Sequence, residues 1–228
     1  LRMNDAALDA YIQQQIAAQR GCEILFAWQG GEPTPMGVDF FERAVALQRR
    51  YAGDRTVQNA FQTNGVLLDD AWGKFLKREN FLVGLSIDGP QPLHDLYRVD
   101  KGGKPTFDRV MRGLEMLKKH GVEFNTLTVV HRENARQPLE VYRFLKEIGS
   151  GFLQFIPLVE RLPAAETVAR GLDHAPPPTP GTGETEVTEW TVRAPDYGEG
   201  RGSSGEEGVQ QDVGEFFFQF FDVSLGIW

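Results

Sequence analysis

The stretch EILFAWQGGEPT, residues 23–34, carries the pattern that decides the fold. Its first half, residues 23–28, is a short apolar run of strand length. Two glycines, Gly30 and Gly31, then form a turn, and an amphipathic segment of helical length follows at residues 38–51. A strand, a tight turn and a helix in this order make one βα unit.

The same unit recurs along the first two thirds of the chain. Further strands are expected at residues 57–62, 82–87, 123–130 and 152–156, and helices at 5–20, 38–51, 69–78, 106–120 and 138–148. Repeated strand–helix alternation predicts an α/β fold with a parallel sheet and right-handed crossovers. A (β/α) barrel or partial barrel is the first expectation, and an open doubly wound sheet is the second. Three strands are apolar almost throughout, which is typical of strands buried on both faces.

Composition excludes several classes of protein. The 228 residues, 41% of them hydrophobic, suffice for one sizeable core. The net charge is −8 with no long basic run, so nucleic acid is not an expected partner. No apolar run approaches the roughly 20 residues of a spanning helix, so no membrane association is expected. The single cysteine, Cys22, rules out an internal disulfide, favours a reduced cytoplasmic setting and is expected to be a buried small hydrophobe.

The chain is expected to have three parts. Residues 1–162 carry the βα repeats and form the core. Residues 163–208 are rich in Pro and Gly and poor in large apolar residues, which is typical of a flexible linker or insert. Residues 209–228 regain hydrophobicity and begin a C-terminal segment. Because the chain starts at Leu1 and stops inside an apolar stretch, we expect it to be a fragment that is incomplete at both ends.

Polar and small residues follow the strands at the point where each strand ends. The carboxyl ends of parallel strands lie at one edge of a sheet, and ligands of βα folds bind there. This edge is therefore the expected site, and it gathers Gln29, Gly30, Gly31, Glu32, Thr63, Asn64, Ser86, Asp88, His94, Arg98 and His131.

Two charged residues at this edge have alternative interpretations. Glu32 accepts bonds from a ligand ammonium group, or it caps the helix that follows its turn. Arg98 holds a carboxylate or phosphate through its guanidinium fork, or it pairs with Asp88 or Asp95 to order its own loop. The histidines His94 and His131 are expected mainly to order loops.

Five motifs taken together resemble one known family. They are FAWQGGEPTPMG, QTNG, SIDGPQPLHDLYR, VVHRENA and LQFIPLVER, in this order along the chain. The pattern resembles the radical S-adenosylmethionine superfamily and, within it, the anaerobic sulfatase-maturating enzymes. The resemblance covers residues 1–161 and resumes at 189–197 and 212–228. It implies a partial (β/α)6 barrel.

The resemblance also implies an activity. In that family a 4Fe-4S cluster cleaves S-adenosylmethionine, and the 5′-deoxyadenosyl radical abstracts a hydrogen from a Cys or Ser of a sulfatase, which becomes formylglycine. The partners implied are the sulfatase, as protein or peptide substrate, and an electron donor such as a reduced ferredoxin or flavodoxin. The protein supplies binding and orientation, and the cofactor supplies the radical chemistry.

Cofactor-binding roles are carried over by motif position. Gly30, Gly31 and Glu32 would bind the methionine ammonium group, and Gln29 would line the same pocket. Ser86 and Arg98 would hold the ribose and carboxylate portions. The remaining contacts implied are Thr63 and Asn64 at the next strand end and Leu158 against the adenine.

Two cysteine-containing parts of the family pattern are absent from this chain. The CxxxCxxC motif that ligates the cluster is absent and is expected before Leu1, so no metal ligand is assigned in this chain. A cysteine-rich domain with auxiliary clusters and a proton-accepting Asp is expected beyond Trp228, so the catalytic residues stay unassigned. This chain alone is expected to be inactive.

Three rival functions stay open. One is a related maturase that crosslinks or epimerises a ribosomal peptide. Another is a cluster-free binding fragment or pseudoenzyme. A third, a sugar-phosphate barrel, needs a glycine-rich phosphate loop late in the chain, and GTGETE at 181–186 lacks the flanking strand and helix.

Overall fold

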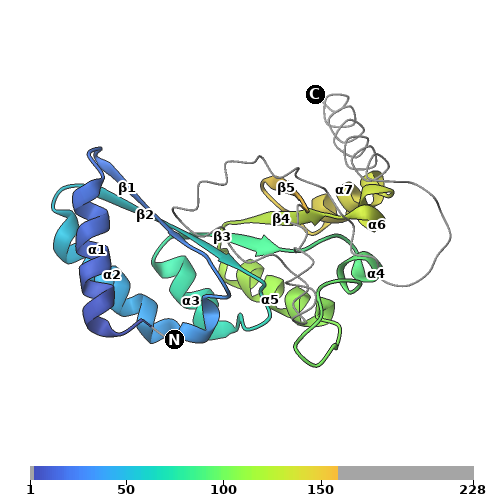
Figure 1. The fold of residues 1–228 in the computed structure, drawn as a ribbon, viewed down its shortest axis with the longest axis horizontal. Coiled ribbons are helices and arrows are strands. Elements are labelled where there is room, and N and C mark those ends of the chain that lie inside the picture. Colours follow the sequence, from blue (N-terminus) through green and yellow to red (C-terminus); the bar gives the residue numbers. More distant parts are fainter. Residues whose placement is uncertain (1–2, 159–228) are drawn as a thin grey trace, which may run out of the picture. The chain divides into compact units, whose positions relative to one another are not determined.

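The computed structural model describes residues 3–158, and Figure 1 shows the arrangement of their helices and strands. The linker expected at 163–208 and the C-terminal segment expected at 209–228 lie outside the described residues. The described part divides between two compact units, residues 3–128 with 144–154, and residues 129–143 with 155–158.

All five expected strands and all five expected long helices are present, with boundaries within two residues of the expected ones. The strands are β1 (Glu23–Trp28), β2 (Thr56–Thr63), β3 (Phe81–Ser86), β4 (Phe124–Val130) and β5 (Leu153–Pro157). The long helices are α1 (Asp5–Ala18), α2 (Val38–Ala52), α3 (Asp70–Arg78), α5 (Phe107–His120) and α7 (Pro138–Glu147). Three short turns of helix were not anticipated: η1 (Thr34–Met36), α4 (Gln91–His94) and α6 (Arg132–Ala135).

The strands follow one another in the sheet in chain order, β1-β2-β3-β4-β5, and the pairs β1–β2, β2–β3 and β3–β4 are parallel. A doubly wound sheet reverses its strand order at a switch point. Sequential order has no such reversal, and crossovers of one hand then place the helices on one face. In the first unit α1, α2, α3 and α5 lie on the same face of the sheet (Figure 1). The fold is therefore the α/β partial barrel of the first expectation, and the doubly wound alternative is wrong.

Burial alternates along the strands, which corrects one expectation. In β1, Ile24, Phe26 and Trp28 are buried under the helices, whereas Leu25 is 52% exposed. In β3, Leu82 is likewise exposed between buried neighbours. The expectation that the apolar strands are buried on both faces is therefore wrong for the described residues, because one face of the sheet lines an open groove.

An aromatic cluster fills the core between the sheet and its helices. Phe41 of α2 is at its centre, and its ring centroid lies 5.3 Å from that of Trp28, 5.1 Å from Phe61 and 5.6 Å from Trp72. Edge-to-face pairs of this kind add to the stabilisation from burial. The cluster fixes α2 and α3 against β1 and β2, and so fixes the ends of those strands.

Two features of the surface go beyond the sequence. Cys22 is exposed, so the expectation that it is buried is wrong. At the end of α5, His120, which a helix C-terminus alone would explain as a partner of the helix dipole, also lies with its Nε2 2.9 Å from a carboxylate oxygen of Asp70. Lys119, Lys74 and His120 all contact Asp70, and together they hold the pKa of that carboxyl well below its usual range.

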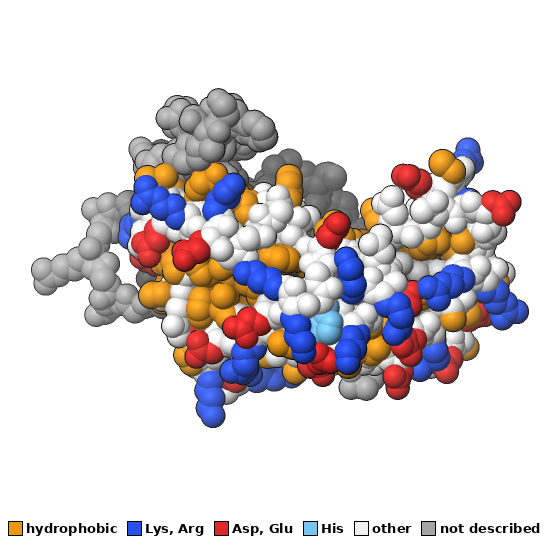
Figure 2. Space-filling model, turned by 180° about the vertical axis from the view of Figure 1, so that it is seen from behind, with side chains coloured by type: hydrophobic (Ala, Val, Ile, Leu, Met, Phe, Trp, Pro, Cys, Tyr) orange, Lys and Arg blue, Asp and Glu red, His pale blue; other side chains and the backbone are white. Residues whose placement is uncertain are grey.

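Charged side chains of both signs are interspersed on the molecular face shown in Figure 2. Several of the surface charges form ion pairs, such as Arg78 with Glu42 at 2.7 Å. Among the helices within residues 3–158, none is long and apolar enough to cross a membrane.

Candidate functional site

The loops that follow β1, β2 and β3 start side by side. The register pairs Trp28 with Phe61 and Thr63 with Leu85, so the three strands end at the same edge of the sheet. Neighbouring strands are about 4.8 Å apart, which brings the three loops within reach of one small molecule. Every residue predicted for the site from Gln29 to Arg98 lies on one of these loops or strand ends, within the first unit.

Glu32 ties the first loop to the second. Its Oε1 accepts bonds from the Thr34 N–H (3.1 Å) and hydroxyl (2.7 Å) and from the Thr63 hydroxyl (2.7 Å). Its Oε2 accepts one bond, from the Asn64 N–H at 2.7 Å. A carboxylate has about four lone-pair positions, two on each oxygen, so Oε2 keeps acceptor capacity beside this loop junction.

The double-glycine turn leaves the backbone open beside Glu32. Gly30 and Gly31 have φ of 95° and 58°, in the region that favours glycine. A Cβ placed on either glycine would meet nothing within 4 Å, and Gln29 is exposed next to them. The turn therefore presents its peptide groups to any molecule that lies against it.

Arg98 is held by Asp88 across the third loop. Its Nε donates to Oδ2 of Asp88 at 2.5 Å, and one Nη donates to Oδ1 at 3.0 Å. The Asp88 side chain is only 4% exposed and that of Arg98 is 24% exposed. Arg98 therefore does pair with Asp88 within its own loop, as one of the two interpretations predicted. A guanidinium has five N–H donors in one plane, so this side-on pair leaves the opposite edge of Arg98 facing away from Asp88.

His94 fixes the backbone of the same loop. The fully buried ring accepts the Asp88 N–H at Nδ1 (3.3 Å), and Nε2 lies 3.1 Å from the Thr106 hydroxyl. That hydroxyl donates to the Arg98 carbonyl at 2.6 Å, so Nε2 carries the proton and the imidazole is neutral. Burial, and to a lesser extent the Arg98 charge, lower the pKa of His94 to about 4. His94 is a loop-ordering residue, as expected.

The other predicted residues lie in different surroundings. Ser86 ends β3, is buried and is in register with Leu127 of β4. Asn64 accepts the Val66 N–H at 3.0 Å through Oδ1, which shapes the turn after β2. Leu158 belongs to the second unit, where its N–H donates to the Val130 carbonyl at 3.0 Å. The cofactor contacts predicted for Ser86, Asn64 and Leu158 stay predictions.

His131 also belongs to the second unit and caps α6. Its Nδ1 lies 3.4 Å from the Asn134 N–H, and its own N–H donates to the Asn134 side chain at 2.8 Å. This reciprocal pair is a capping box, which accounts for His131 as a residue that orders its loop.

An open groove of about 180 Å³ runs over the exposed face of the sheet beside the double-glycine turn. One row of residues across the strands is apolar: Ala27 is in register with Ala60, and Ala60 with Leu82. The next row is more polar, with Gly84 between Gln62 and Asn125. A Cβ on Gly84 would meet the Leu127 side chain at 2.6 Å, so glycine keeps this row open. Four amide side chains line the groove: Gln29, Gln62, Asn125 and Gln154.

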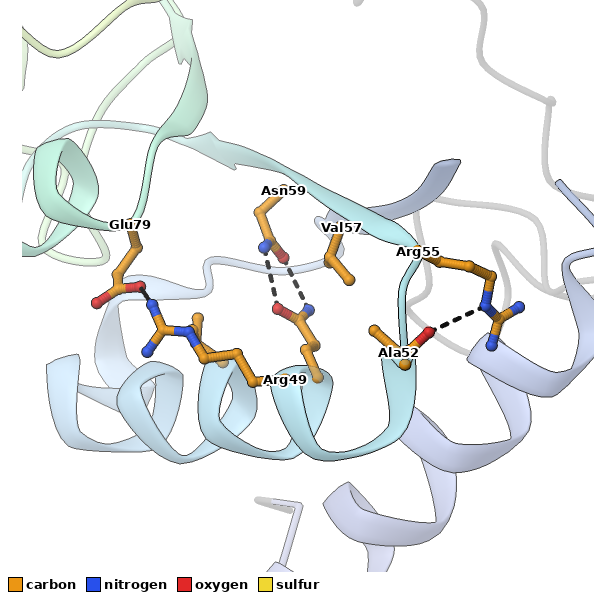
Figure 3. A pocket seen from close by; sticks show the side chains of 9 residues that line it. Arg49, Ala52, Arg55, Val57, Asn59 and Glu79 are labelled. Atoms are coloured by element: carbon orange, nitrogen blue, oxygen red, sulfur yellow. Dashed lines mark hydrogen bonds and ion pairs between the residues drawn. The ribbon is translucent and has the colours of Figure 1, made fainter. Parts of the chain in front are cut away.

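A larger pocket, of about 290 Å³, lies elsewhere, over the first half of β2 (Figure 3). Its charged groups are already satisfied within the protein. Arg49 pairs with Glu79 at 2.5 Å, and Arg55 donates to three backbone carbonyl groups, among them that of Ala52 at 3.2 Å. Nothing in this pocket converges on a ligand, so its size does not make it the functional site.

The residues present do not fit an iron–sulfur cluster. A cluster of this type needs several thiolate ligands, and the chain has one cysteine, Cys22, which lies just before the start of β1 and is exposed. Within the described range, no group of three or more His, Cys, Asp or Glu side chains is arranged to hold a metal ion. No chemical step in this chain is therefore derived through a cluster.

Part of the site is not visible in the sequence pattern. The sequence marks Thr106 only as the start of a helix, yet its hydroxyl joins His94 to the Arg98 backbone. The groove amides Gln62 and Asn125 were also missed. Their alternation with buried neighbours in β2 and β4 was the available signal, and the apolar character of the strands concealed it.

Comparisons with known proteins identify relatives of this chain. The chain is 42% identical over 232 aligned residues to a serine-type anaerobic sulfatase-maturating enzyme of Bacteroides thetaiotaomicron, an alignment that covers 99% of this chain and 53% of that protein. It is 44% identical to a cysteine-type anaerobic sulfatase-maturating enzyme of Clostridium perfringens, over 70% of this chain and 43% of that protein. The chain thus spans about half the length of the curated relatives it matches.

The fold comparison points the same way. A solved structure described as native anSMEcpe with bound AdoMet and Kp18Cys peptide superposes with a TM-score of 0.67 and 43% identity, covering 70% of this chain and 44% of that one. Residues 4–145 match the Radical SAM superfamily, which is more than half of the chain. This chain belongs to the Radical SAM superfamily.

Proposed function

We propose that this chain is the S-adenosylmethionine-binding part of an anaerobic sulfatase maturase, an oxidoreductase that converts a Cys or Ser of a sulfatase to formylglycine. The observation that carries the proposal is that three neighbouring strands end at one sheet edge, where their loops carry an open double-glycine turn, an anchored glutamate and an anchored arginine. The similarity to serine-type and cysteine-type maturases supports the choice of reaction.

The polar groups at this edge match the methionine end of the cofactor. An ammonium group needs acceptors, which Glu32 Oε2 and the peptide carbonyls of Gly30 and Gly31 offer. A carboxylate needs donors, which the outer edge of the Arg98 guanidinium offers. When bound and reduced, S-adenosylmethionine supplies a 5′-deoxyadenosyl radical that abstracts a hydrogen atom from the substrate. The chain's own residues bind the cofactor and fix its orientation.

The groove over the sheet is the proposed place for the substrate. Amide side chains both donate and accept hydrogen bonds, which suits the alternating N–H and C=O groups of an extended peptide. Gln29 belongs to the groove and also adjoins the cofactor turn, so a peptide residue at this end would lie beside the cofactor. We further propose a cytoplasmic protein that receives electrons from a reduced ferredoxin or flavodoxin.

Binding and catalysis test different parts of the proposal. Equilibrium dialysis of the full-length gene product with S-adenosylmethionine should show that Arg98→Ala and Glu32→Ala weaken binding by about 10-fold or more, as expected for charge-assisted hydrogen bonds. Unchanged affinity in both variants refutes the site. The matched control is Arg109→Ala, which removes another arginine paired with an aspartate, Asp100.

The reaction is tested with the gene product and a sulfatase peptide under reducing, anaerobic conditions. A new peptide aldehyde, detected by a carbonyl-reactive probe, supports the maturase. A crosslinked or epimerised peptide without an aldehyde supports the rival ribosomal-peptide maturase. A gene that encodes no CxxxCxxC motif ahead of Leu1 supports the cluster-free rival.

A further inference from the structure

We propose that Asp88 is a positioning residue that holds the Arg98 guanidinium in the orientation in which its outer edge binds the cofactor carboxylate. This inference rests on the proposed function of Arg98 and deepens it. Asp88 itself does not touch the cofactor in this proposal, and it acts through the two bonds of 2.5 and 3.0 Å to Arg98.

The geometry of the pair suits orientation. Both oxygens of Asp88 engage one edge of the guanidinium, through Nε and one Nη, so the planar group has one allowed rotation about its long axis. An arginine side chain loses much rotamer freedom when it is fixed, and a bound partner that fixes it beforehand removes that loss from ligand binding. The Asp88 carboxylate is buried, with 4% of its side chain exposed, whereas the Arg98 side chain reaches the surface.

The energetics of the pair point in the same direction. Burying a carboxylate loses its hydration, and a buried ion pair contributes little net stability compared with apolar packing. An aspartate with 4% exposure is therefore poorly explained as a source of stability alone. It is well explained if the arginine must keep one orientation at the sheet edge.

The backbone on both sides of the pair is anchored separately. The Asp88 N–H donates to Nδ1 of His94, and the Arg98 carbonyl accepts from the Thr106 hydroxyl, which the same histidine contacts through Nε2. Asp95 accepts the N–H groups of Thr106 and Phe107, both at 2.9 Å, which ties the loop to the start of α5. Because these bonds fix the backbone, the main freedom left is rotation of the Arg98 side chain, and the carboxylate of Asp88 restricts it.

A second ion pair nearby provides a matched control. Arg109 pairs with Asp100 at 2.9 Å, and both side chains are about one third exposed. The substitutions Asp88→Asn and Asp100→Asn make the same chemical change. Only Asp88→Asn places an amide N–H₂ group against an N–H of Arg98, and it therefore removes one of the two hydrogen bonds that orient the guanidinium.

The test measures binding of two ligands to the full-length gene product by equilibrium dialysis. S-Adenosylmethionine carries the carboxylate, and decarboxylated S-adenosylmethionine lacks it. Asp88→Asn is expected to weaken binding of the first about 10-fold, and to leave binding of the second unchanged. Asp100→Asn should change neither affinity. In an Arg98→Ala background, Asp88→Asn should have no further effect, because the group through which it acts is gone.

Each contrary result has a distinct meaning. If Asp88→Asn weakens both ligands equally, Asp88 supports the loop as a whole and the positioning inference is wrong. If it weakens neither while Arg98→Ala weakens S-adenosylmethionine, the inference is wrong and the proposed function stands. If Arg98→Ala leaves the affinity for S-adenosylmethionine unchanged, the carboxylate role of Arg98 fails, and this inference fails with it.

Discussion

Single residues at the sheet edge order the loops and still offer polar groups to the proposed ligand. The Glu32 carboxylate joins Thr34, Thr63 and Asn64 while Oε2 retains acceptor capacity. The two interpretations open for Glu32, a ligand contact and a local cap, are therefore compatible. The same holds for Arg98, whose pairing with Asp88 uses only one edge of the guanidinium.

Asn59 holds Trp28, the last residue of β1 before the loop that carries the double-glycine turn. Its Oδ1 accepts bonds from Trp28 Nε1 at 2.8 Å and from Gln48 Nε2 at 2.9 Å, and Nδ2 donates to Gln48 Oε1 at 3.0 Å. Asn59→Ala leaves these buried groups without a partner and should lower the free energy of unfolding by about 2–3 kcal/mol in urea denaturation. Gln58→Ala, at an exposed neighbour, should change it by less than about 0.5 kcal/mol. Equal effects of the two substitutions would contradict this assignment.

His94 makes stability depend on pH. The pKa of its buried ring is about 4, against 6.5 for an unperturbed histidine, with Arg98 lowering it and Asp88 and Asp95 partly opposing the shift. As pH falls below 6.5, the unfolded chain binds a proton that the folded chain does not, so stability falls until about pH 4. The loss is about 3 kcal/mol. His94→Gln should flatten this part of the pH profile of unfolding, and an unchanged slope would show that another group is responsible.

At the scale of helices and strands, the sequence predicted more than it did for single side chains. Hydrophobic spacing located every long helix and strand within residues 3–158, because these elements bury continuous apolar faces. It misjudged β1 and β3, since an apolar residue such as Leu25 looks the same in sequence whether it faces a core or a groove. The short α4 was missed because its place depends on the contacts of His94, which are set by tertiary structure.

The contact of α5 with the loop after β2 requires a glycine. A Cβ at Gly113 would lie 2.2 Å from the carbonyl oxygen of Gly65, which is backbone and has little room to move. Gly→Ala in a helix normally stabilises by up to about 1 kcal/mol. Here we expect Gly113→Ala to destabilise by about 1–3 kcal/mol, as for an overpacked core. The control is Glu115→Ala on the exposed face of α5, and stabilisation by Gly113→Ala would contradict the close approach.

At the scale of the whole chain, strand order and loop chemistry support one another. Sequential parallel strands place the QGGEPT, TNG and SIDGP segments at the ends of three neighbouring strands, which the sequence alone predicted. The chain holds a single cysteine, so no radical step of the proposed reaction is assigned to its own residues. In this account, the chain supplies the residues that bind and orient the cofactor.

The most direct test is a crystal structure of the full-length gene product with S-adenosylmethionine. We predict that the cofactor's ammonium group lies within hydrogen-bonding distance of Glu32 and the double-glycine turn. In the same molecule, the carboxylate should accept from the outer edge of Arg98 while Asp88 keeps its two bonds to that residue. A cofactor bound with its ammonium and carboxylate groups away from Glu32 and Arg98 would contradict the account.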